Sequence, residues 1–143
     1  RFILFDFAHA PIPQSDLVQF INSWPSGGGI KEANAFFAKQ AQTHKIFIAT
    51  EGTYGLLPEA VEMYLVNNTN VTIKGYWPIN DMLPKDVAKT SIAMPTYFVF
   101  YEPCPSCSNT DEAPSNWPLK KIVSYQRGIG TMYLTVYQVI PGE

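Results

Sequence analysis

The chain has 143 residues, of which 46% are hydrophobic and 15% are charged, and its formal net charge is −2. This length suits one domain with a sizeable core, and the absence of clustered Lys and Arg argues against charge-driven nucleic-acid binding. The charged fraction lies below the average of about a quarter, which indicates a partner surface. No apolar run approaches the roughly 20 residues that cross a bilayer, so we expect the chain itself to be soluble.

The first third of the chain predicts one strand and two helices. Residues 1–7 are aromatic and apolar, which is typical of a buried strand. Ser15 or Asp16 can cap a short helix, and a break rich in proline and glycine follows. Apolar residues then recur at helical spacing over residues 30–42. Because the chain begins without Met on a strand-like run, we expect it to be a piece of a longer or processed protein.

The remaining elements predict an α/β fold. Residues 45–50 are a near-continuous apolar run, as in a strand buried on both faces of a parallel sheet. Pro58 fits the first turn of the next helix. A further helix is predicted over residues 84–90, and strands over 71–76, 96–101, 119–126 and 132–140, the last two forming a hairpin. We therefore expect residues 1–143 to form a single domain, a three-layer sandwich with a mostly parallel, Rossmann-like sheet and an antiparallel C-terminal edge.

A glycine-bearing turn joins the strand at 45–50 to the following helix and is the first candidate site. It contains Glu51, Gly52, Thr53, Tyr54 and Gly55. Open α/β sheets bind ligands at the carboxyl ends of their strands, where a helix N-terminus can attract an anion or a sugar hydroxyl. The spacing is neither a Walker loop nor GxGxxG, and the Glu51 carboxylate suits a sugar better than a phosphate. The alternative is a purely structural strand-to-helix corner.

The glycine-rich break at residues 24–29 is the second candidate site. The Trp24 ring can stack on a sugar face, while Ser26 and Gly27 lie beside it in sequence. The same residues also suit a structural role, in which Ser26 caps the helix that begins near Ile30 and Trp24 packs into the core. We expect this loop and the turn at 51–55 to lie at the same edge of the sheet.

Cys104 and Cys107 are the only cysteines in the chain. A CxxC pair can belong to a zinc site, a redox centre or a disulfide. Zinc needs four ligands and only two distant histidines could complete the set, so we expect no metal and no cofactor. A loop-clamping disulfide or a pair of free thiols is favoured over a redox module, and no catalytic triad or paired-carboxylate motif is visible.

Several motifs taken together carry a family resemblance that spans residues 11–139. They are, in chain order, WPSGGGIKEA, KIFIATEGTYGLLPEAVEMYL, IKGYWPI, PTYFVFYEPCPSC, WPLKKI and YLTVYQV. This series resembles the soluble C-terminal portion of bacterial multi-spanning membrane glycosyltransferases, the group of dolichyl-phosphate-mannose-protein mannosyltransferases and aminoarabinose transferases.

The resemblance implies an accessory domain on the extracytoplasmic face of a bacterial membrane. Such enzymes use a polyprenyl-phosphate-linked sugar donor, and their catalytic acidic residue lies in a loop between the first transmembrane helices. We expect this chain not to contain that loop, so no catalytic residue is assigned here. The implied partners are the transmembrane part of the same polypeptide and a lipid-linked sugar or glycan acceptor, with no nucleic acid. The alternative function is a free-standing small-molecule or nucleotide-binding α/β domain that uses the turn at 52–55.

Overall fold

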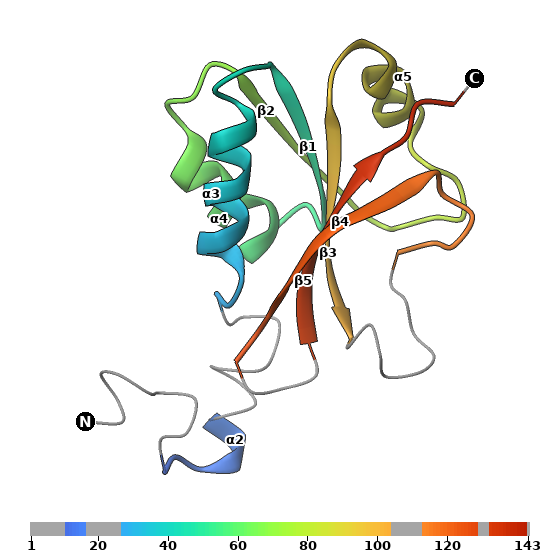
Figure 1. The fold of residues 1–143 in the computed structure, drawn as a ribbon. Coiled ribbons are helices and arrows are strands. Elements are labelled where there is room, and N and C mark those ends of the chain that lie inside the picture. Colours follow the sequence, from blue (N-terminus) through green and yellow to red (C-terminus); the bar gives the residue numbers. More distant parts are fainter. Residues whose placement is uncertain (1–10, 17–26, 104–112, 129–131, 143) are drawn as a thin grey trace.

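The computed structural model describes residues 11–16, 27–103, 113–128 and 132–142 (Figure 1). Within these ranges the chain forms an α/β fold around a 5-stranded sheet. The strand expected at residues 1–7, Trp24, Ser26, Cys104 and Cys107 lie outside the described residues.

The sheet has the strand order β2-β1-β3-β5-β4. β1 pairs in parallel with both β2 and β3, whereas β5 pairs antiparallel with β3 and β4. The predicted parallel central strands and antiparallel C-terminal edge are thus confirmed. The strands are β1 (Ile46–Glu51), β2 (Val71–Tyr76), β3 (Thr96–Pro103), β4 (Leu119–Gln126) and β5 (Met132–Val139).

Three helices of nine or more residues accompany the sheet, together with one short helix near the N-terminus of the described part. Each of the three longer helices turns apolar residues toward the core, and helical spacing predicted such a stripe for the first two of them. Figure 1 shows α3 and α4 beside one another. The helices are α2 (Gln14–Asp16), α3 (Ile30–Gln40), α4 (Leu56–Leu65) and α5 (Lys85–Ala93).

Two buried clusters account for the core, and they draw on alternate residues of the central strands. Ile46 and Ile48 of β1 pack with residues of α3 and α4, such as Phe37 and Val61. Phe47 and Ala49, the intervening residues of the same strand, belong to the second cluster, together with Val87 of α5. Successive side chains of a strand point to opposite faces of the sheet, so β1 is buried on both faces.

Aromatic rings dominate the second cluster. Phe98 and Phe100 of β3 are both fully buried and stack with a centroid distance of 4.5 Å. Trp117 meets Phe98 edge to face at 5.2 Å and is itself 5% exposed. Such contacts add to the apolar area that these rings bury. They fix the segment before β4 against the sheet.

Candidate ligand-binding site

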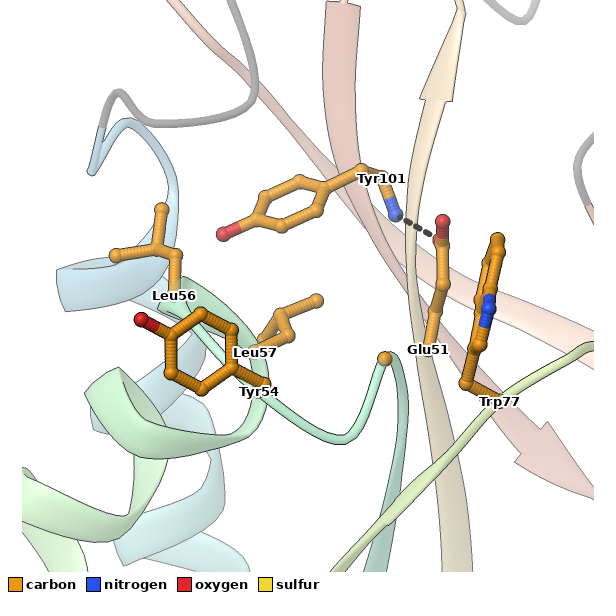
Figure 2. Close-up of a pocket in the computed structure, with 7 residues that line it drawn as sticks. Glu51, Tyr54, Leu56, Leu57, Trp77 and Tyr101 are labelled. Carbon is orange, nitrogen blue, oxygen red and sulfur yellow. Dashed lines mark hydrogen bonds between the residues drawn. The ribbon is translucent and has the colours of Figure 1, made fainter.

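A pocket of about 270 Å³ opens at the carboxyl end of β1 (Figure 2). In the sheet, β2 lies on one side of β1 and β3 lies on the other side. The chain passes from β1 to β2 and then crosses back to β3, so the strand order reverses at the end of β1. Open α/β sheets bind ligands in the crevice at such a point. The lining residues are Glu51, Gly52, Tyr54, Leu56, Leu57, Trp77 and Tyr101.

The turn after β1 is held tightly against the end of β2. The Gly52 N–H donates a hydrogen bond to the Tyr76 carbonyl at 2.8 Å, and Gly52 has a φ of 84°, a conformation that favours glycine. A Cβ atom at Gly75 would lie 2.2 Å from the Gly52 carbonyl oxygen and 2.9 Å from the Thr53 Cα atom. Both glycines are therefore needed for the close approach that places this turn beside β2.

The carboxylate of Glu51 is fixed across the gap between two strands. Pairing of β1 with β3 ends at Thr50 and Val99, so β1 offers no carbonyl partner to the Tyr101 N–H. The Glu51 Oε2 atom accepts that hydrogen bond instead, at 2.9 Å. Figure 2 shows this bond and the Glu51 side chain between the Tyr101 backbone and the Trp77 ring. The carboxylate thus has a defined position at the pocket.

Tyr101 brings a buried hydroxyl to the same pocket. Its ring is 8% exposed, and the Arg127 guanidinium carbon lies 3.9 Å from the ring centroid, in cation–π geometry. Among the described residues the hydroxyl has no hydrogen-bond partner. Figure 2 shows it pointing toward Leu56 and Tyr54. A buried polar group without a partner is unusual, and a ligand can satisfy it.

The protonation of this hydroxyl follows from its surroundings. Burial raises the pKa of Tyr101 well above its usual value; Arg127 acts in the opposite direction, and Glu51 raises the pKa further. The phenol therefore keeps its proton at neutral pH. It can donate a hydrogen bond to a ligand oxygen, whereas the Glu51 carboxylate, if ionised, only accepts.

Two exposed aromatic side chains flank the pocket. Tyr54 is 86% exposed and Trp77 is 66% exposed. Figure 2 places the Trp77 ring beside Glu51 and the Tyr54 ring on the other side of Leu57. Large aromatic surfaces next to a few fixed polar groups are typical of ligand pockets. The turn and the end of β2 thus contribute one ring each.

The start of α4 differs from the anion site that the sequence suggested. Leu57 has φ −112° and ψ 120°, outside the helical range, so regular helix begins at Pro58, which has no N–H to offer. Pro58 does lie in the first turn, as predicted. The Glu51 carboxylate lines the pocket, and no Lys or Arg does so in the described part of the chain. These features favour a neutral or hydroxyl-rich ligand over a phosphate.

Of the other predicted site residues, Thr53, Gly55 and Gly27 belong to the described part of the chain, and none of them lines the pocket. Thr53 and Gly55 belong to the turn, whereas Gly27 lies before α3, where an added Cβ atom would have nothing within 4 Å. At the next residue, Gly28, an added Cβ atom would lie 2.9 Å from the Arg127 Cα atom. The N-cap of α3 is Gly29, and no side-chain hydrogen bond caps the helix there. Gly28 therefore lies beside Arg127, whose guanidinium packs on the Tyr101 ring.

Trp77, Tyr101 and Leu57 line the pocket but were absent from the sequence prediction. Leu57 lies at the start of α4, Trp77 directly follows β2 and Tyr101 lies near the end of β3. The strand order brings Trp77 and Tyr101 beside the turn. The sequence did contain a signal that could have placed Trp77 at this site. Glu51 ends β1 and Trp77 directly follows β2, and the carboxyl ends of neighbouring parallel strands meet at one edge of the sheet.

A second polar cluster anchors the end of β2 to α5. The Lys74 ammonium and the Tyr76 hydroxyl both donate hydrogen bonds to Asp86 Oδ2. The hydrogen bond from Lys74 is the main reason that the pKa of Asp86 lies below its usual value. Burial, with the bond to Asp86, raises the pKa of Tyr76. The cluster therefore helps to hold the segment that carries Trp77.

Within the described ranges, no helix is long and apolar enough to cross a membrane, and no group of three or more His, Cys, Asp or Glu side chains is arranged to hold a metal ion. A scan against protein-family models, a search of curated proteins and a search of solved structures found no match.

Proposed function

We propose that this chain binds a saccharide in the pocket at the end of β1. The single observation that carries the proposal is the arrangement around Glu51: a carboxylate fixed at 2.9 Å by a backbone N–H, with the exposed rings of Tyr54 and Trp77 on either side.

The chemistry of these groups matches that of a sugar ring. The C–H face of a pyranose is apolar and packs on an aromatic ring, while its hydroxyl groups need hydrogen-bond partners. Glu51 accepts a hydrogen bond from a sugar hydroxyl, and the buried Tyr101 hydroxyl donates to a ring or hydroxyl oxygen. A sugar would therefore satisfy a buried hydroxyl of this pocket that lacks a hydrogen-bond partner among the described residues.

This binding serves, in our proposal, a membrane glycosyltransferase that uses a polyprenyl-phosphate-linked sugar donor. The chain acts as its accessory domain on the extracytoplasmic face of a bacterial membrane, in contact with the transmembrane part of the same polypeptide. It helps to bind the acceptor or the donor head group, and bond formation takes place outside it. The sequence motifs and the low charged fraction of 15% support this assignment.

The architecture that goes with this role is a three-layer, Rossmann-like sandwich. Residues of α3 and α4 join one buried cluster, and Val87 of α5 joins the other, which supports helices on both faces of the sheet. The parallel order β2-β1-β3 around a central first strand supports the Rossmann-like comparison.

Titration of the chain with glucose, mannose, galactose and N-acetylglucosamine, followed by calorimetry, tests the proposal. We expect at least one sugar to bind, with Trp77→Ala weakening its affinity about tenfold through loss of a ring contact and its burial. Glu51→Gln keeps the shape of the side chain but removes its charge, and we expect several-fold weaker binding.

Matched controls separate the pocket from general surface effects. Tyr64 is 66% exposed on α4 and does not line the pocket, so Tyr64→Ala should leave affinity unchanged. Glu62→Gln is the corresponding control for the loss of charge. Binding of inorganic phosphate or UDP at the turn, with no sugar bound, would instead support the nucleotide-binding alternative and contradict the proposal.

A further inference from the structure

A second pocket, of about 250 Å³, lies beyond Trp77. It is formed by the segment that follows β2, by Tyr76 at the end of that strand and by Trp117, which lies two residues before β4 and packs on the aromatic cluster. Its lining residues are Tyr76, Trp77, Pro78, Ile79, Asn80, Met82, Pro84 and Trp117.

The two pockets share Trp77 and no other lining residue in the described part of the chain. Leu57 and Tyr101 of the first pocket belong to the core cluster on the α4 face of the sheet. Trp117 of the second pocket belongs to the opposite cluster, and Tyr76 packs against it. Trp77 therefore stands at the carboxyl edge of the sheet with one pocket on either side.

The exposure of Trp77 matters because its ring lines both pockets and is accessible to a ligand. Its side chain is 66% exposed, although Trp side chains in folded proteins are highly buried on average. Figure 2 shows the ring edge-on, with one face turned toward Glu51.

The walls of the second pocket are held in place before any ligand arrives. Trp117 packs edge to face on Phe98 at 5.2 Å, and the Tyr76 hydroxyl donates to Asp86 at 2.9 Å. The Asn116 amide donates to the Asp81 carbonyl at 2.6 Å, which ties the segment after β2 to the segment around Trp117. A site built in advance loses less conformational entropy on binding.

We propose that the two pockets are neighbouring subsites for one oligosaccharide. The first sugar unit lies between Glu51 and Trp77, and the adjoining unit lies in the second pocket, past the edge of the Trp77 ring, where the exposed Asn80 amide serves its hydroxyl groups. Three aromatic rings and one amide line the second pocket, and no charged side chain does so among the described residues. The second unit is therefore a neutral sugar.

This inference rests on the proposed saccharide function and extends it from one sugar unit to two. The test compares glucose, mannose and N-acetylglucosamine with their β-linked disaccharides by calorimetry on the same chain. We expect the preferred disaccharide to bind about tenfold more tightly than its monosaccharide, as one additional ring contact provides. Asn80→Ala should reduce this advantage several-fold while leaving monosaccharide affinity unchanged.

Asn67→Ala, at an exposed position after α4, is the matched control and should preserve the advantage. Equal affinity for monosaccharide and disaccharide, with monosaccharide binding still sensitive to Glu51→Gln, overturns the second subsite and leaves the proposed function intact. A gain with the octyl glycoside but none with the disaccharide also overturns it, because the pocket then takes an alkyl chain. Absence of all saccharide binding overturns both proposals together.

Discussion

Replacing Gly75 by alanine should displace the turn that carries the candidate site. The added Cβ atom would lie 2.2 Å from the Gly52 carbonyl oxygen and 2.9 Å from the Thr53 Cα atom, both of them backbone atoms. Normal contacts are about 3.5 Å or longer, so the turn must move by roughly 1 Å. Overpacking of this kind costs about 1–3 kcal/mol of unfolding free energy.

Urea denaturation measures this loss directly. With a denaturant slope of about 2 kcal/mol per M, a loss of about 2 kcal/mol lowers the unfolding midpoint by about 1 M. The displaced turn should also weaken saccharide binding, since it carries Glu51 and Tyr54. Gly27→Ala is the control, because its Cβ atom would meet nothing within 4 Å. A Gly75→Ala variant with the midpoint and affinity of the original chain would refute the proposed contact between β2 and the turn.

Two further substitutions separate binding from stability. Tyr101→Phe removes a buried hydroxyl that has no hydrogen-bond partner among the described residues. The unfolding free energy measured in urea should therefore stay equal or rise by up to about 1 kcal/mol, while calorimetry should show several-fold weaker sugar binding. A clear loss of stability would mean that the hydroxyl has a structural partner. The hydrogen bond from Lys74 is the main cause that lowers the pKa of Asp86 below its usual value of 3.8. The ionised Asp86 carboxylate therefore stabilises the folded state fully well above pH 3.8, and this stabilisation is lost as the pH falls through the lowered pKa. Asp86→Asn should therefore flatten the acid side of the stability profile measured by urea unfolding, and an unchanged profile would rule out this contribution.

Local sequence signals were sufficient for most helices and strands in the described ranges. The apolar run at 45–50 predicted β1, observed at Ile46–Glu51, because a strand buried on both faces needs apolar residues at successive positions. α5 extends to Ala93, three residues beyond the expected end at Thr90. It stops where Met94 becomes extended, with φ −154°, because the following Pro95 disfavours helical backbone there. That proline was a readable signal.

The candidate site was only half predictable, for a reason that concerns topology. Glu51, Gly52 and Tyr54 are adjacent in sequence, so a single strand-to-helix turn pointed to them. Trp77 and Tyr101 enter the same pocket from two other strands, and this depends on the order β2-β1-β3, which no local pattern encodes. The kink at Leu57 was equally hidden, and it sets the regular part of α4 back from the turn.

The most direct test of saccharide binding at the end of β1 is an NMR titration of the isotope-labelled chain with the monosaccharide panel. We predict that saturable shifts concentrate on the Trp77 indole and on the backbone amides of residues 51–54 and 101, and that they disappear in Trp77→Ala. Shifts confined to the far ends of the strands, or shifts at the turn that only phosphate produces, would contradict the account.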